Sequence, residues 1–317
     1  MDLPVTSFFL FGATTTNWTT PLWMVGVGAG IAAAILVVAY LLLQQAAPKI
    51  AAIARTTTKE ALSQPLFYVV LAIGLFALIL FPFIPYNTFG EDIKMVKDTG
   101  LTLIMVLSIF LALWTASVSI ADEIEGRTAL TLLSKPITRR SFILGKFLGI
   151  AGPVAILFIV LGSLFLATVS YKVAYDARES GQPAPTREQC AYEMKEIVPG
   201  LVLAFLEAMV LTSISVAIST RLPMTANLVI CMSVYVLGHL VPMLTQADPE
   251  QLEIVGFVGG FLATILPVLD HFNIYNSIST GQEVPWSYVG RAAVYCFLYS
   301  SVAMLVALLL FEDRDLA

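Results

Sequence analysis

Long apolar runs separated by short polar segments dominate the chain. Seven of these runs have about 20 residues, the length that an α-helix needs to cross the hydrocarbon core of a bilayer. They cover residues 22–43, 66–85, 101–121, 142–169, 198–220, 227–244 and 288–311. An eighth apolar run, 254–269, is shorter and contains several glycines and a proline, which is typical of a re-entrant or interfacial segment. The pattern predicts an all-α, polytopic membrane bundle.

Composition agrees with this class of protein. The chain has 317 residues, of which 58% are hydrophobic and 12% are charged, whereas about 25% of the residues of a soluble domain are charged. The mean hydropathy is +0.86. The net charge of −5 argues against a nucleic-acid-binding protein, because such a protein presents a basic face. The largest polar segment, an expected outer loop at 170–197, is too short to form a soluble domain.

Lys and Arg residues predict the orientation of the chain in the membrane. Ten of them fall in the alternate segments 44–65, 122–146, 221–226 and 312–317, and six fall in the opposite segments 86–100 and 170–197. Cytoplasmic loops carry the excess of Lys and Arg, so we expect the first group of segments in the cytoplasm. Seven spans then place the N-terminus outside and the C-terminus in the cytoplasm. If the run 254–269 crossed the membrane, the C-terminus would lie outside.

The polar segment between the third and fourth runs has an amphipathic pattern. Acidic residues gather where the third run ends, and Ile124, Leu130, Leu132, Leu133 and Ile137 then mix with polar positions. This spacing predicts a short helix along the membrane interface. Pro136 ends it, because proline disfavours helix in the preceding residue. The pattern fits a helix that docks on another protein, and it also fits an ordinary charged cytoplasmic loop.

The same segment resembles the signature of type-2 ABC transporter permeases. The resemblance rests on an acidic stretch, a run of leucines, a Ser-x-Pro turn, a basic pair and a Gly-Lys pair. These residues are Glu123, Glu125, Gly126, Thr128, Leu130, Leu132, Leu133, Ser134, Pro136, Arg139, Arg140, Gly145 and Lys146. Residues 53–68 resemble the family's amphipathic elbow helix, and residues 308–316 resemble its closing helix and charged tail. Within the family, the chain is most similar to the subgroup associated with maturation of multicopper enzymes.

The resemblance covers about residues 50–317 and implies a six-helix permease core plus one extra N-terminal transmembrane helix. We expect the extra helix within residues 1–48 and the permease domain at 49–317, with an elbow helix at 49–64 and a cytoplasmic coupling segment at 122–141. One departure bears on the local turn of the coupling segment. The family often has Arg before Gly-Thr, whereas Gly126 precedes Arg127 here.

The resemblance also implies a function. Such a chain is the permease of an ATP-driven exporter in the cell membrane, and it couples ATP hydrolysis on a separate ATPase subunit to movement of a substrate. The sequence has no phosphate-binding Gly-x4-Gly-Lys-Ser/Thr loop. We therefore expect no enzymatic activity and no cofactor in this chain, with ATP and Mg on the partner subunit.

The implied partners are an ABC ATPase, a second permease chain in a homo- or heterodimer, and membrane lipids, with no nucleic acid. The residues implied to dock on the ATPase are the charged Glu123, Glu125 and Arg127 and the apolar Leu130, Leu132 and Leu133. Two other functional classes compete with this one. An intramembrane enzyme is disfavoured, since the sequence lacks His-Glu-x-x-His and Gly-x-Ser-x-Gly motifs. A non-transporting scaffold that binds an ATPase to transmit a mechanical signal stays open.

Glu207 is the one acidic residue well inside an apolar run. An ionisable group in hydrocarbon costs about 2.5–3.5 kcal/mol, so we expect this side chain to face the interior of the bundle. It is interpreted either as a pathway or gating residue, or as a protonated or hydrogen-bonded structural acid beside Thr212 or Ser213. His239 and His271 lie far apart in sequence, and their spacing gives no metal-binding pattern.

Overall fold

The computed structural model describes residues 18–86, 91–121, 138–245, 260–261 and 263–312. These residues form long helices and short helical turns, with no strand among them. The elements are α1 Leu22–Ala46, α2 Pro48–Ser63, α3 Pro65–Leu80, η3 Phe81–Phe83, α4 Asp92–Ala116, η4 Ser117–Ala121, α7 Arg139–Glu179, α8 Arg187–Ser219, α9 Met224–Thr245, η5 Leu269–Phe272, α11 Tyr275–Thr280 and α12 Trp286–Glu312. Seven of these helical segments are long and apolar enough to cross a membrane. The all-α, polytopic membrane bundle expected from the sequence is therefore confirmed.

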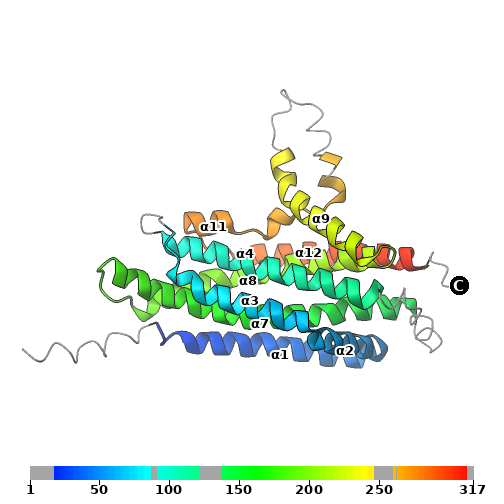
Figure 1. The fold of residues 1–317 in the computed structure, drawn as a ribbon, viewed down its shortest axis with the longest axis horizontal. Helices are drawn as coiled ribbons and strands as arrows, with labels where there is room; N and C mark the ends of the chain where they lie inside the picture. The colour runs from blue at the N-terminus through cyan, green and yellow to red at the C-terminus, as the bar shows by residue number, and fades with distance from the viewer. Residues whose placement is uncertain (1–17, 87–90, 122–137, 246–259, 262, 313–317) are drawn as a thin grey trace, which may run out of the picture.

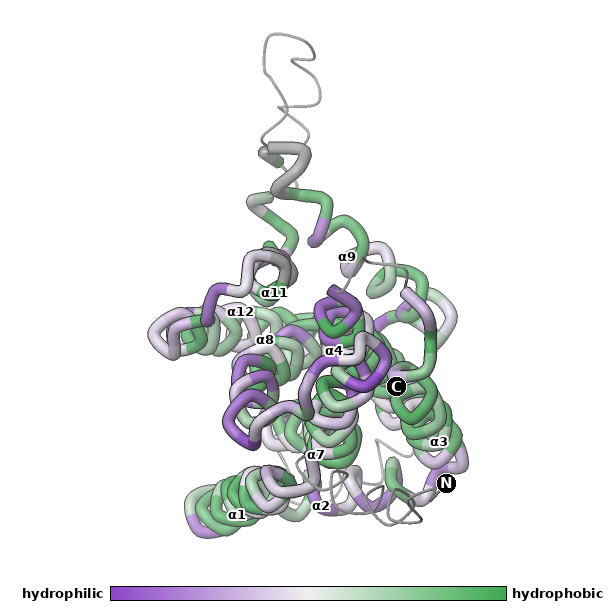
Figure 2. Tube along the Cα trace, turned by 90° about the vertical axis from the view of Figure 1, so that its left-hand side faces the viewer, coloured by the Kyte–Doolittle hydropathy of each residue, from purple (hydrophilic) through white to green (hydrophobic). Residues whose placement is uncertain are grey.

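The long helices lie side by side along one axis, with α9 tilted away from the rest (Figure 1). One end of the bundle carries α2, the start of α7 and the end of α12, and we call it the α2 end. The opposite end carries the α7–α8 turn and the starts of α4 and α12 (Figure 1). Seen from this opposite end, hydrophilic residues gather at the near ends of helices around α4 and α8, whereas α1 and α3 are mostly hydrophobic (Figure 2). Polar helix ends around an apolar middle are the pattern that a bilayer requires.

The core of the bundle is formed by α4, α7 and α8, the three spans with the largest buried share. The helix α1 lies at the periphery and has no buried residue, and it packs mainly against α7 and α2. Several of its large side chains, including Trp23, Ile31 and Ile35, are more than half exposed. Exposed apolar surface of this extent is stable only in contact with lipid or protein, so α1 presents a surface for one of these at the edge of the bundle.

The helices α2 and α7 pack closely through small residues. A Cβ atom at Gly145 would lie 2.7 Å from the side chain of Ile53, and one at Gly149 would lie 2.6 Å from Thr57. The hydroxyl of Thr58 donates a hydrogen bond of 2.8 Å to the carbonyl of Gly149. Glycine at such positions lets two helix backbones approach, which is a common basis of helix association in membranes. The segment expected to form an elbow helix is thus a helix fixed to the first part of α7.

The connection between α7 and α8 is much shorter than the expected outer loop at 170–197. The helix α7 continues to Glu179 and α8 begins at Arg187, so only residues 180–186 connect them. Gly181, with φ of +67°, ends α7, and the amide of Gln182 donates to the carbonyl of Ala177. A capping box between Thr186 and Gln189 starts α8. Most polar residues of 170–197 therefore belong to α7 and α8, which continue beyond the ends of their apolar runs.

The expected re-entrant run 254–269 lies partly outside the described residues. Residues 263–265 of it are helical, and the chain then enters η5, which packs against α8 and α9, and α11, which packs against α4. After α9 the chain thus returns to the bundle and follows it as short broken elements until α12 begins (Figure 1). This broken segment, residues 263–280, covers one side of α4 and α8.

Candidate functional site

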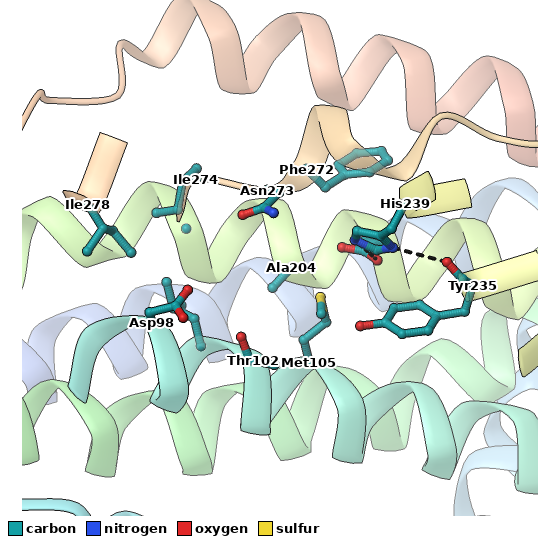
Figure 3. A pocket seen from close by; sticks show the side chains of 13 residues that line it. Asp98, Thr102, Met105, Ala204, Tyr235, His239, Phe272, Asn273, Ile274 and Ile278 are labelled. Atoms are coloured by element: carbon teal, nitrogen blue, oxygen red, sulfur yellow. Dashed lines mark hydrogen bonds and ion pairs between the residues drawn. The ribbon is translucent and has the colours of Figure 1, made fainter. Parts of the chain in front are cut away.

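A cavity of about 280 Å³ lies between α4, α8, α9 and the broken segment. Its polar lining comes from four elements and consists of Asp98, Thr102, Glu207, Tyr235, His239 and Asn273. Leu101, Met105, Phe272, Ile274 and Ile278 supply apolar walls. Asp98 lies toward one end of the cavity and Tyr235 and His239 toward the other, with Thr102 between them (Figure 3).

Helical spacing brings the lining residues together. Asp98, Leu101, Thr102 and Met105 follow the three- and four-residue steps that place side chains on one face of α4. Gly200, Ala204 and Glu207 do the same on α8, and Tyr235 and His239 do so on α9. Gly200 is required by the close approach of the broken segment, because a Cβ there would lie 2.4 Å from Ile274. Three helix faces and the returning chain thus form the walls of the cavity.

Glu207 is the most deeply buried acidic group of the cavity, with 1% of its surface exposed. Its Oε1 atom has no hydrogen-bond partner among the described residues. The nearest basic atom is Nε2 of His239, at 3.5 Å from Oε1, which is too long for a hydrogen bond. The hydroxyls of Thr212 and Ser213 donate to the carbonyls of Ala208 and Val210 in their own helix.

The ring of His239 is also held by its own helix. Its Nδ1 atom lies 3.1 Å from the carbonyl oxygen of Tyr235 (Figure 3). When Nδ1 carries the proton and donates to this carbonyl, Nε2 of the neutral ring is an acceptor. Neutral His239 then offers no donor to an ionised Glu207. The arrangement leaves a buried carboxylate oxygen without a donor in the wall of a cavity.

A second polar cluster lies where α4 ends. Asn227, at the start of α9, places its Nδ2 atom 2.7 Å from the hydroxyls of Ser117 and Ser215 and 3.0 Å from that of Ser219. Its Oδ1 atom accepts from the thiol of Cys231 at 3.3 Å. An amide nitrogen has only two hydrogens, so Asn227 can donate to two of the three hydroxyls at a time. The cluster joins the π-turn η4 to α8 and α9.

Two buried lysines connect helices near the end of the bundle that carries the α7–α8 turn. Lys97 of α4 forms ion pairs with Glu193 and Glu196 of α8. Lys172 of α7 lies 2.9 Å from Asp176 and 3.7 Å from Asp92 of α4. Both lysine side chains are almost fully buried, so these contacts fix the relative positions of α4, α7 and α8.

The structure tests the sequence-derived site residues unevenly. Glu207 lies in the cavity. The docking residues expected in the coupling segment lie outside the described residues; they are Glu123, Glu125, Arg127, Leu130, Leu132 and Leu133. Asp98 and Tyr235 were not recognised from the sequence, since Asp98 falls among loop-like charges and Tyr235 in an ordinary apolar run. For Asp98, the spacing of three and four residues to Leu101 and Thr102 is the signal that could have placed it on one helix face with them.

Comparison with known families gives a match that covers most of the chain. Residues 80–316 match the family described as ABC-2 family transporter protein. The match begins at the last residue of α3 and runs through α12. No match is found among curated proteins. The matched family is that of type-2 ABC permeases, which are membrane subunits and not ATPases and which associate with an ABC ATPase subunit. The chain therefore belongs to the ABC-2 transporter family and is a multi-pass membrane component of an ABC transporter.

Proposed function

We propose that this chain is the permease subunit of an ATP-driven exporter and that its coupling segment, residues 122–141, docks on the ATPase subunit. The observation that carries the proposal is the membership in the family, together with the way the helices on both sides of this segment are fastened into the bundle. Two copies of the permease, or two related chains, would act with two ATPases. The closer similarity to the multicopper-maturation subgroup stays a prediction.

The helix before the coupling segment ends in the Asn227 cluster. The π-turn η4 runs to Ala121 and shares hydrogen bonds with α8 and α9 through Ser117 and Asn227. Such i→i+5 turns are rare and frequently occur at functional sites. A push on residues 122–137 would therefore reach α8 and α9, which line the cavity.

The helix after the coupling segment is fastened to α2. The side chain of Thr138 caps α7 by accepting from the amide of Ser141 at 3.2 Å, and the next turns pack on α2 through Gly145 and Gly149. Phe142 stacks on Phe311 near the end of α12, with ring centroids 5.7 Å apart. Movement of the ATPase would thus be passed to α2, α7 and α12 as one unit.

A test for alternating access distinguishes the proposed transporter from a scaffold that only transmits a signal. Thr102 lines the cavity and is exposed, and the three native cysteines are buried. In proteoliposomes with the ATPase, we expect a cysteine in Thr102→Cys to be labelled from one face of the membrane without nucleotide. Trapping with ATP and vanadate should transfer its labelling to the other face. The same variant labelled from a single face under both conditions, with normal ATPase activity, would support the scaffold.

The orientation of the chain is proposed from its charges and is tested by impermeant thiol reagents. Arg140 lies at the start of α7 and Gln182 just beyond its end, and both residues are exposed. We expect Arg140→Cys to react only from the cytoplasm and Gln182→Cys only from outside, because the Lys- and Arg-rich segments face the cytoplasm. Reversed labelling of the pair would overturn the orientation. A tag at Ala317 should be cytoplasmic.

A further inference from the structure

We propose that the cavity between α4, α8, α9 and the broken segment binds an organic ammonium cation, with the carboxylate of Glu207 as its counter-charge. The inference rests on the proposed function only in naming what the transporter would carry. Binding itself depends on the cavity alone, so it is measured without the ATPase.

The first argument is the state of Glu207. A polar group that is buried without a hydrogen-bond partner is costly, and a buried charge is more so. Glu207 lines the cavity and is 1% exposed, and its Oε1 atom has no hydrogen-bond partner among the described residues. A ligand that brings a positively charged N–H group to this oxygen would supply the missing donor and the missing charge in one contact.

The second argument is the sign of the charges around the cavity. Asp98 of α4 provides a second carboxylate in the lining, beside that of Glu207. Among the described residues, no Lys or Arg lines the cavity, and His239 is its one basic side chain. The aromatic rings of Tyr235 and Phe272 add faces that attract a cation. The lining therefore favours a cation over an anion.

The third argument is the apolar lining, which favours an organic body over a bare metal ion. Leu101, Met105, Ile274 and Ile278 form much of the wall. The lining residues of α8 extend from Gly200 to Glu207, which is about 10 Å along a helix. The described residues contain no group of three or more His, Cys, Asp or Glu side chains that could hold a metal ion. A primary amine with an alkyl chain of about six carbons matches this shape.

The experiment uses hexylammonium as the probe and hexanol and hexanoate as isosteric controls. Binding is measured by equilibrium dialysis of radiolabelled probe against the full chain in nanodiscs of zwitterionic lipid, with empty nanodiscs subtracted. We expect saturable binding of hexylammonium, at least 10-fold tighter than hexanol, and no binding of hexanoate. Glu207→Gln should weaken hexylammonium binding by at least 10-fold and leave the weak binding of hexanol unchanged.

Two further variants make the result specific. Glu188→Gln removes an exposed carboxylate of the same helix and should bind as the parent does. Ala204→Leu adds volume to the cavity wall and should weaken binding of both hexylammonium and hexanol. Equal binding of amine and alcohol, unchanged binding in Glu207→Gln, or no saturable binding by the folded parent would each overturn the inference. If the binding inference fails but the label on Thr102→Cys still moves from one face of the membrane to the other with ATP and vanadate, the proposed transport function stands without this binding site.

Discussion

Replacing both Leu132 and Leu133 with alanine is expected to release the ATPase subunit while the permease stays in the membrane. The reason is apolar burial at the proposed docking surface, since full burial of one leucine side chain is worth about 1.5–3 kcal/mol. Loss of most of this contribution at two positions should weaken assembly by about 100-fold or more. The measurement is a pull-down of the ATPase with the tagged permease, together with permease-stimulated ATP hydrolysis.

A matched control makes the same chemical change on a lipid-facing surface. Leu305 and Leu309 of α12 are each more than 60% exposed, so the pair Leu305→Ala and Leu309→Ala should retain the ATPase. Glu123→Lys should release it only in part, and the effect should be smaller at high salt, because screening shortens the reach of charges. If the Leu132 and Leu133 variant keeps full ATPase binding and stimulation, residues 122–141 form an ordinary loop and the docking assignment is wrong.

The replacement Lys97→Met is expected to destabilise the bundle by about 3–5 kcal/mol, the cost of removing one partner of a buried ion pair. The side chain of Lys97 is 4% exposed and that of Glu196 is 8% exposed, so the variant leaves an uncompensated carboxylate between α4 and α8. The measurement is the midpoint of thermal unfolding of the purified protein in nanodiscs, which should fall clearly.

The control for this prediction lies one turn away on the same helix. Lys94 pairs with Glu91 at 2.8 Å, and both side chains are substantially exposed, so Lys94→Met should change stability by about 0–1 kcal/mol. Removing the charges together, in Lys97→Met with Glu193→Gln and Glu196→Gln, should recover much of the loss, because no buried charge then remains unpaired. Equal unfolding midpoints for Lys97→Met and Lys94→Met would show that the Lys97 pairs do not hold α4 to α8.

The sequence predicted too long a connection between α7 and α8, since a loop was expected over residues 170–197 and only residues 180–186 connect the helices. Gly181 and the Thr186-x-x-Gln189 capping box are local signals for the end of one helix and the start of the next. The many charged residues of 170–197 are typical of a loop, and they led to the prediction of a loop despite these signals. Charged residues can remain within these helices because they have ion-pair partners; Lys172, for example, pairs with Asp176 and Asp92.

The sequence by itself determined the class of the protein and the seven helices that are long and apolar enough to cross a membrane among the described residues. Apolar runs of bilayer length are a local property, since every backbone polar group in hydrocarbon must be satisfied within its own helix. The type-2 permease signature at 122–146 also lies in one continuous stretch, and the match over residues 80–316 confirms the family. For Glu207, the sequence predicted a side chain directed to the interior, because an isolated acid in an apolar run has few other stable places.

Only the tertiary structure decided what surrounds Glu207 and Asn227. The cavity joins Asp98, Glu207 and His239 from three helices, and the Asn227 cluster joins Ser117 to Ser215 and Ser219. Such pairings depend on the rotation and depth of each helix relative to its neighbours. Rotation and depth are set by close contacts such as Gly149 on Thr57 and Gly200 on Ile274. A hydropathy pattern does not predict these contacts, because an apolar side chain is equally stable against lipid and against another helix.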